Sequence, residues 1–246
     1  MKLFIMFFSN FLIKNSLRSN KSFIWDSNTK KLKKVKTFKS LNINLLIGIE
    51  RQKNTLLQNT VNFANGNFTN NALLWGSRGN GKSSLIKSIF IEVNKNYNNL
   101  KLLQINKNDI FDIEIIYEIL GKFNKYSFIF FIDDLSFEKI DSDYKIIKST
   151  LDGSIQNQPN NILLYVTSNR RHLMPRDMIE NERSSAIHAD ESVEEKISLS
   201  DRFGLWIGFH NLSQNDYLEI IKKYCFEFNL TFNENIKKEC IRWSYK

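Results

Sequence analysis

The chain has 246 residues, of which 42% are hydrophobic and 25% are charged. These proportions are those of a globular protein, and the length allows one α/β domain with a sizeable core and a small appendage. The two cysteines and three histidines have no metal-ligand spacing, which excludes a disulfide-rich or zinc-binding class and fits a reducing compartment.

The net charge of +9 is concentrated in residues 1–40, where ten basic side chains stand against Asp26 alone. The sequence therefore predicts a basic N-terminal arm over residues 1–40. Such an arm could contact nucleic acid or an anionic membrane surface. The simplest interpretation is a solvated, lysine-rich extension, because the arm lacks the arginines and interleaved aromatics of a good single-strand binder.

The first residues of this arm are apolar up to Ile13, but Asn10 interrupts them and no small-residue cleavage site follows. The pattern therefore differs from a secretory signal, and the stretch is too short to span a bilayer. We expect no transmembrane span and a cytoplasmic protein, with membrane association of this stretch left open.

Beyond the arm, helical and strand-like segments alternate, and prolines are almost absent. Such alternation predicts an α/β fold with a doubly wound parallel sheet, and residues 212–246 then suggest two further helices. The polar, acidic segment 176–196 is expected to be an exposed connection. Helices are predicted near 45–63, 85–90, 109–120 and 144–151, and strands near 72–75, 100–105, 128–132, 162–166 and 205–209.

A phosphate-binding loop of the form G-x-x-x-x-G-K-S lies between the predicted strand at 72–75 and the helix that follows it. Glycines let the backbone curl so that several N–H groups point at phosphate oxygens, and the helix adds its positive end. Lys82 can reach the β- and γ-phosphates, and the Ser83 hydroxyl can ligate Mg²⁺. The sequence thus predicts that the chain binds ATP. The predicted contacts are Gly76, Ser77, Arg78, Gly79, Asn80, Gly81, Lys82, Ser83 and Ser84.

Two aspartates follow the apolar strand at 128–132. A carboxylate at the tip of a buried strand beside the loop can hold Mg²⁺, and we assign this role to Asp133 together with Ser83. Asp134 is the candidate for polarising the attacking water. Its side chain is short for that task, so Glu138 is an alternative base and slow hydrolysis is an open possibility.

Two further candidates follow later in the chain. Asn169 ends the strand at 162–166 and could bond the γ-phosphate or position the water. Arg202, just before the last strand, could reach the nucleotide of a neighbouring subunit as an arginine finger, or could simply pair with a surface acid such as Asp201. Arg170 and Arg171 are ambiguous between phosphate contact and solvation.

This order of motifs resembles the AAA+ ATPases, and most closely one bacterial family of predicted AAA+ ATPases catalogued as a domain of unknown function. The resemblance extends over roughly residues 41–225 and is most specific in the strings Asp-Asp-Leu-Ser-Phe-Glu and Ser-Asn-Arg-Arg-His-Leu. The similar stretches lie at 48–53, 76–84, 133–138, 144–145, 167–173 and 198–206.

The resemblance implies an αβα nucleotide-binding core, here 41–210, and a helical lid, here a short one at 211–246. It also implies a ring or partial ring of subunits, with Asn169 as the first sensor and Arg202 as the finger. Gly48 and Ile49 would lie against the adenine. The family's second sensor arginine has no clear counterpart, since Arg242 is the only late arginine.

The reading that we favour is an AAA+ ATPase that hydrolyses ATP with Mg²⁺ and remodels an unknown macromolecular client. Two alternatives stay open. One is a DNA-associated ATPase similar to replication loaders and initiators, with the basic arm as its DNA contact. The other is a nucleotide switch with little hydrolysis.

Overall fold

The computed structural model describes residues 2–36, 38–137, 142–151, 158–173 and 199–244, so the predicted connection at 176–196 and Glu138 lie outside the described residues. Within these ranges the strands form one seven-stranded sheet in the order β2-β1-β4-β5-β6-β3-β7. All neighbouring pairs are parallel except β1 with β2. The strands are β1 (Ser22–Asp26), β2 (Lys31–Lys34), β3 (Ala72–Gly76), β4 (Leu100–Ile105), β5 (Ser127–Ile132), β6 (Ile162–Ser168) and β7 (Leu205–Phe209).

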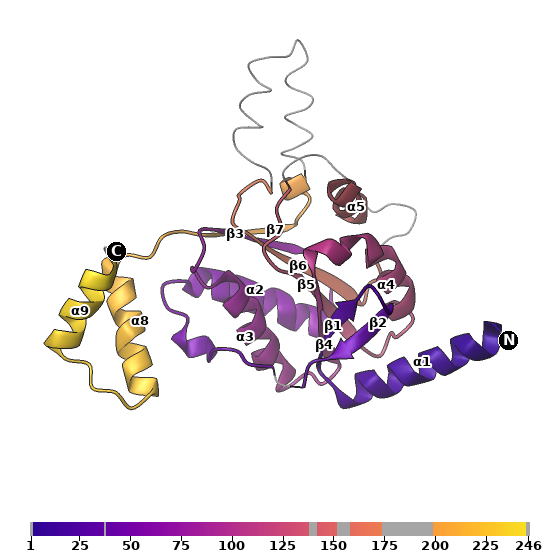
Figure 1. Cartoon of the computed structure of the whole chain (residues 1–246), viewed down its shortest axis with the longest axis horizontal. Helices are drawn as coiled ribbons and strands as arrows, with labels where there is room; N and C mark the ends of the chain where they lie inside the picture. The colour runs from indigo at the N-terminus through magenta and orange to yellow at the C-terminus, as the bar shows by residue number, and fades with distance from the viewer. Residues whose placement is uncertain (1, 37, 138–141, 152–157, 174–198, 245–246) are drawn as a thin grey trace, which may run out of the picture.

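Helices cover both faces of this sheet (Figure 1). One core lies between the sheet and α2 and α3, and a second core lies between the sheet and α4 and α5. The αβα sandwich predicted from the sequence is therefore confirmed. The helices and 3-10 turns are α1 (Lys2–Ser19), η1 (Ile43–Leu45), α2 (Glu50–Ala64), α3 (Lys82–Asn94), η2 (Lys107–Asp112), α4 (Ile113–Leu120), α5 (Ser142–Leu151), α8 (Gln214–Glu227) and α9 (Glu234–Ser244).

Strand β5 shows why the sheet is central. Its residues Phe128 to Ile132 are all buried, because side chains alternate between two covered faces. Phe130 and Ile132 belong to the core under α4 and α5, while Ile129 and Phe131 belong to the core under α2 and α3. A continuous apolar run is thus what a fully covered parallel strand requires.

The predicted strands at 100–105 and 205–209 have those bounds in the structure. The first predicted helix begins later than expected, at Glu50, because Gly48 has a left-handed φ of 75° and interrupts the helical path after η1. The helix predicted at 109–120 divides into the 3-10 turn η2 and the helix α4.

The N-terminal arm contains strands that the sequence analysis missed. Residues 22–34 form a hairpin, and β1 pairs in parallel with β4, so this part of the chain extends the sheet. The turn is held by Asp26, whose carboxylate accepts from the Asn28 N–H and the Thr29 hydroxyl, and by Lys30 at φ 50°. Part of the expected extension is therefore folded against the core.

Helix α1 precedes this hairpin and projects from the body with its N-terminal end outermost (Figure 1). Its C-terminal half is anchored, since Leu17 is fully buried in the core under α4 and Ile13 packs against the same core. Among the residues that the structure describes, no helix combines the length and apolar character needed to cross a membrane.

Helices α8 and α9 form a separate pair beside α2 and α3, reached by an extended segment after β7 (Figure 1). Ser213 caps α8 by accepting from the Asp216 N–H, and the Asp216 carboxylate accepts in return from the Ser213 N–H. Lys223 of α8 donates to the Asn44 carbonyl at 3.4 Å, which places α8 against η1.

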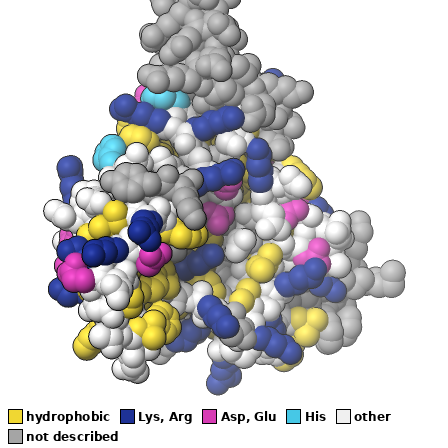
Figure 2. Space-filling model, turned by 60° about the vertical axis from the view of Figure 1, so that its left-hand side comes forward, with side chains coloured by type: hydrophobic (Ala, Val, Ile, Leu, Met, Phe, Trp, Pro, Cys, Tyr) yellow, Lys and Arg dark blue, Asp and Glu magenta, His cyan; other side chains and the backbone are white. Residues whose placement is uncertain are grey.

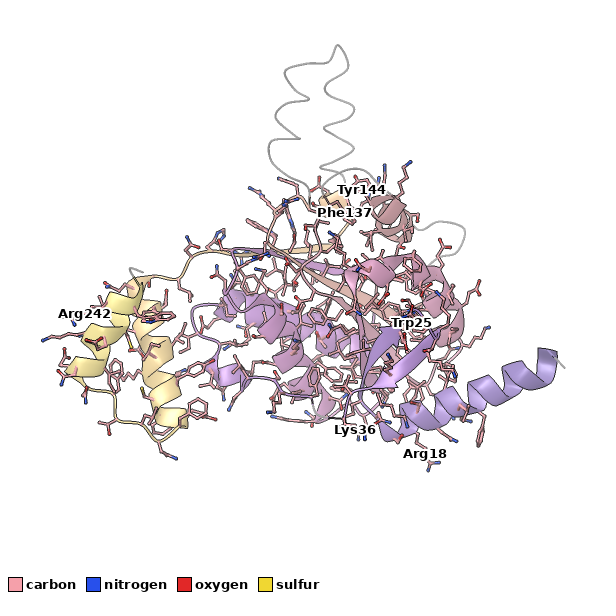
Figure 3. All side chains as sticks on the ribbon, viewed as in Figure 1. Arg18, Trp25, Lys36, Phe137, Tyr144 and Arg242 are labelled. Carbon is pink, nitrogen blue, oxygen red and sulfur yellow. The ribbon has the colours of Figure 1, made fainter. Side chains whose placement is uncertain are left out.

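The hairpin is tied to η2 by Asp112, which is 1% exposed. Its carboxylate accepts from the Trp25 indole N–H at 2.7 Å and from the Lys30 ammonium at 2.6 Å (Trp25 is labelled in Figure 3).

We expect Asp112→Ala to lower the free energy of unfolding by about 2–4 kcal/mol, because it leaves a buried indole N–H unpaired. Urea denaturation measures this loss. Glu219→Ala, at an exposed surface pair, is the control with an expected change under about 0.5 kcal/mol, and equal effects of the two would contradict the assignment.

Candidate nucleotide site

The carboxyl ends of β3, β5 and β6 meet at one edge of the sheet, where a cavity of about 420 Å³ opens. Parallel strands direct the residues that follow them to a common edge, so segments distant in the sequence converge there. From the predicted set, the cavity is lined by Arg78, Gly79, Asn80, Gly81, Lys82, Ser83, Ser84, Asp133, Asp134, Asn169 and Ile49.

Lys82, the first residue of α3, is only 7% exposed. Its ammonium donates to the Gly76 and Ser77 carbonyls, both at 2.7 Å, and to the Asn169 side-chain oxygen at 3.1 Å. Burial lowers the pKa of Lys82, while the carboxylates of Asp134 and Asp133 oppose that shift. The lysine thus holds the loop in shape and connects it to the end of β6, although Gly76 and Ser77 themselves lie outside the cavity lining.

Two glycines of the loop are required by its geometry. A Cβ on Gly76 would lie 2.1 Å from the Phe209 carbonyl oxygen of β7, so no side chain fits at that position. Gly81 caps α3 with a left-handed φ of 85°, a conformation that glycine adopts without strain. The loop can therefore curl and lead directly into α3, whose N-terminal N–H groups face the cavity edge and favour an anion.

Asp133 joins the loop to two strands. One of its carboxylate oxygens accepts from the Ser83 hydroxyl at 2.5 Å and from the Thr167 hydroxyl at 2.6 Å. A carboxylate beside a loop hydroxyl fits Mg²⁺, which binds through one or two carboxylates together with phosphate oxygens and water. Among the described residues there is no cluster of three or more acidic, histidine or cysteine side chains that could hold a metal ion.

Asp134 adopts a left-handed φ of 53°, which directs its side chain differently from that of Asp133. Its backbone N–H donates to the Thr167 hydroxyl at 2.9 Å. Its carboxylate accepts a short hydrogen bond from the Asn169 amide, and the Arg78 guanidinium lies 3.7 Å away. Two predicted catalytic residues, Asp134 and Asn169, are therefore bonded to each other in this structure.

Part of the cavity lining is apolar. Ile49 belongs to it, whereas Gly48 lies just outside the lining and packs close to Leu212 and Asp216. Helix α8 also contributes to this apolar lining, which sequence reasoning missed because helical periodicity alone does not tell which side chains face a ligand. The apolar lining consists of Leu41, Leu45, Leu46, Ile47, Ile49, Leu212, Ile220 and Tyr224.

Arg202 does not lie in this cavity. It lines a different one, of about 530 Å³, among residues that precede β3 and β6, such as Asn70 and Pro159. Those residues mark the amino edge of the sheet, opposite the edge where the phosphate loop lies. The structure therefore separates Arg202 from the other predicted catalytic residues of the same chain.

Three other arginines considered in the sequence analysis, Arg170, Arg171 and Arg242, make contacts outside the nucleotide cavity. Arg170 donates to the Phe137 carbonyl at 3.0 Å, and the Arg171 guanidinium stacks on Trp75 and Trp206 at 5.2 and 4.9 Å from the ring centroids. Neither lines the nucleotide cavity. Arg242, labelled in Figure 3, lies on α9 and pairs with Glu239 at 2.9 Å, and it is not part of the cavity lining either.

Comparison with known families and structures places this site in context. The family model described as "Protein of unknown function (DUF815)" matches residues 18–246. No curated protein matches the chain.

Several solved structures share the fold. A RuvB variant from Thermotoga maritima is 18% identical, with a TM-score of 0.50 over 80% of this chain and 56% of that one. Domain III of the T. maritima replication initiation protein DnaA is 16% identical, with a TM-score of 0.51 over 80% and 78%. A chain of the E. coli MS115-1 HORMA:CdnC:Trip13 complex is 12% identical, with a TM-score of 0.55 over 81% and 74%. This chain spans only about half of RuvB, and these likenesses establish the fold alone.

Because Lys82 both shapes the loop and carries its positive charge, Lys82→Ala should weaken ATP binding by about 10- to 100-fold through the loss of charge-assisted hydrogen bonds. Titration with a fluorescent ATP analogue measures the change. Lys95→Ala, which removes an exposed lysine paired with Glu92 at the far end of α3, is the matched control and should bind normally. Unchanged affinity in Lys82→Ala would contradict the site.

Proposed function

The chain belongs to the family described as "Protein of unknown function (DUF815)" and has the AAA+ fold, and from that premise we propose that it is an ATPase that hydrolyses ATP with Mg²⁺ and remodels a macromolecular client. The observation that carries the proposal is the meeting of Lys82, Ser83 and Asp133 with Asp134 and Asn169 around one cavity. A phosphate loop alone supports binding, whereas acidic and amide groups beyond it support hydrolysis.

In this proposal the triphosphate lies along the loop from Ser77 to Ser84. Backbone N–H groups of the loop and the first turn of α3 bond its oxygens, and Lys82 exchanges a carbonyl partner for the β- and γ-phosphates. Because the Lys82 ammonium is buried, the incoming phosphate charge would also favour its protonated form.

Ser83 and Asp133 would hold the Mg²⁺, as their existing contact supports. When bound, the ion neutralises part of the phosphate charge. The Thr167 hydroxyl, which bonds Asp133, would keep that carboxylate oriented.

Asp134 is the proposed base that orients the attacking water, and Asn169 is the proposed γ-phosphate sensor. The bond between them supports a linked action of the pair, since Asn169 cannot bond both Asp134 and a phosphate through the same N–H group. A γ-phosphate that takes the Asn169 amide would free the Asp134 carboxylate to bind water. This exchange would couple hydrolysis to correct placement of the triphosphate.

The apolar lining residues from the segment around Ile49 and from helix α8 support an adenine site between these two parts of the chain. Leu212, Ile220 and Tyr224 would cover one side of the base, so that bound nucleotide connects the lid pair α8 and α9 to the core. The position of the lid would then report whether nucleotide is bound.

Arg202 supports assembly of several copies. Since it lies at the amino edge, far from its own phosphate loop, it would serve as a finger only for a neighbouring subunit in a ring or partial ring. Such a finger contributes about 10³–10⁵ to the rate where it operates.

Asp134→Asn keeps the size of the side chain and removes its basicity. We expect turnover to fall by about 10²-fold or more while ATP affinity changes less than about threefold, because the contribution of a general base is lost but the phosphate contacts stay. Steady-state phosphate release and equilibrium binding measure the two effects. The control is Glu234→Gln, at an exposed acid of α9 outside the cavity. If neither the native chain nor Asp134→Asn hydrolyses ATP while both bind it, the chain is a nucleotide switch.

Mixing two inactive variants tests the assembly. Arg202→Ala lacks the finger and Asp134→Ala lacks the base, so each alone should be nearly inactive. A one-to-one mixture should regain about a quarter of native turnover, since intact sites form where the two variants meet in the right order. The specific activity of the native chain should also rise with protein concentration. No recovery in the mixture and a flat concentration profile would contradict action between subunits.

A further inference from the structure

The N-terminal region contains a surface that the ATPase site does not use. On α1, Phe11 and Leu12 are each 54% exposed, and Lys14 and Arg18 are exposed as well. Phe11, Lys14 and Arg18 lie three and four residues apart, so they share one face of the helix. Phe11 and Leu12 lie on the side of α1 away from Ile13 and Leu17, which contact the core. Lys14 and Arg18 flank Phe11, so apolar and basic groups are exposed side by side on α1.

Where α1 ends, lysines from three neighbouring strands come together. Ser22 lies opposite Leu102 in β4, and the Ser22 carbonyl accepts from the Val35 N–H on its other side. One residue further toward this edge of the sheet, Lys21 therefore lies between Lys101 and the segment that contains Lys36. Adjacent strands are about 4.8 Å apart, which keeps these residues within one row. Figure 3 shows Arg18 and Lys36 along the lower edge of the molecule near the end of α1, and in Figure 2 dark-blue side chains recur along the lower edge.

Lys101 differs from the other lysines of this row because its side chain is buried. It is 3% exposed, and its ammonium lies 5.1 Å from the centre of the Tyr126 ring. Burial lowers the pKa of Lys101, and the neighbouring charge of Lys21 lowers it further. Among the described residues no carboxylate bonds or pairs with either Lys21 or Lys101. The partial negative charge at the C-terminal end of α1, about half an elementary charge, offsets only a fraction of this cluster.

We propose that α1 and this basic row form a docking surface for an anionic phospholipid membrane. The exposed side of α1 would lie in the interface, with Phe11 and Leu12 inserted, while Lys14, Arg18, Lys21 and Lys36 contact lipid phosphates. Two weak signals, one apolar and one basic, are what reversible membrane binding requires. The helix lies along the surface and does not cross the bilayer, in keeping with its length and composition.

The surface fits lipid better than nucleic acid. Nucleic acid would neutralise the lysines, but its phosphate backbone would leave Phe11 and Leu12 in water. A single-strand binder places several aromatic rings between its cations to stack bases, whereas here one exposed ring, Phe11, accompanies cations that extend from α1 to the adjoining strand ends, and Leu12 has no ring to stack. Only an interface that is both apolar and anionic accommodates both features.

The test is sedimentation of the full chain with vesicles at low salt. We expect binding to vesicles of phosphatidylcholine mixed with phosphatidylglycerol, weaker binding as salt is raised, and little binding to phosphatidylcholine alone. The double variant Lys21→Gln/Lys36→Gln should bind about 30-fold more weakly, at about fivefold per lysine. Phe11→Ser/Leu12→Ser should lose about tenfold or more, because about half of each side chain is available for burial.

Matched controls distinguish binding through this surface from non-specific electrostatic and hydrophobic binding to vesicles. Lys222→Gln/Lys238→Gln makes the same charge change on α8 and α9, and Phe226→Ser removes a ring that is 84% exposed on α8. Both should bind vesicles normally, and all variants should keep the native melting temperature. Absence of binding to anionic vesicles, equal losses in the controls, or tighter binding to an oligonucleotide with the same dependence on Lys21 and Lys36 would each overturn the proposal. ATP turnover without vesicles should not change, so the result is independent of the ATPase assignment.

Discussion

The nucleotide site depends on the hydrogen bonds that the Asp133 carboxylate accepts. By accepting from Ser83 and Thr167, this carboxylate connects the start of α3, the end of β5 and the end of β6. Each of these groups comes from a different strand-to-helix or strand-to-loop junction, and only the parallel sheet brings them to one edge. Because both hydroxyls donate to the same carboxylate oxygen, they fix the direction in which the Asp133 side chain points.

The hydrogen bonds of Asp133 also determine the direction of the Asp134 side chain. With Asp133 committed to Ser83 and Thr167, the chain turns through a left-handed conformation at Asp134, and the second carboxylate points toward Asn169 instead. Such a backbone conformation is uncommon for a residue other than glycine and persists only where surrounding contacts enforce it. Adjacent carboxylates in the sequence are thereby given separate partners, which is what the separate roles proposed for them in metal binding and water activation require.

The sequence was sufficient for elements whose signal is local. The run Ser127–Ile132, the loop Gly76–Ser84 and the order of acidic and amide residues behind it depend on patterns within a few residues. The hairpin at 22–34 was missed because its stability comes from distant partners: Trp25 bonds Asp112, 87 residues away, and β1 pairs with β4. For the same reason the bond between Asn169 and Asp134 and the approach of Tyr224 to the cavity had no sequence signal. Lysine-rich composition also masked the alternation of Phe23 and Trp25, which a strand pattern could have shown.

The hairpin fixes where the basic residues of the N-terminal region lie on the molecule. By pairing with β4, it places Lys21 beside the buried Lys101, so a stretch that composition alone describes as a solvated arm becomes a fixed surface at the amino edge. The phosphate loop lies at the opposite, carboxyl edge of the same sheet. A partner held at the N-terminal surface would therefore leave the nucleotide cavity and the helices α8 and α9 unobstructed. The proposed binding at one edge and the proposed hydrolysis at the other could then proceed together, and the rigid sheet between them fixes their separation.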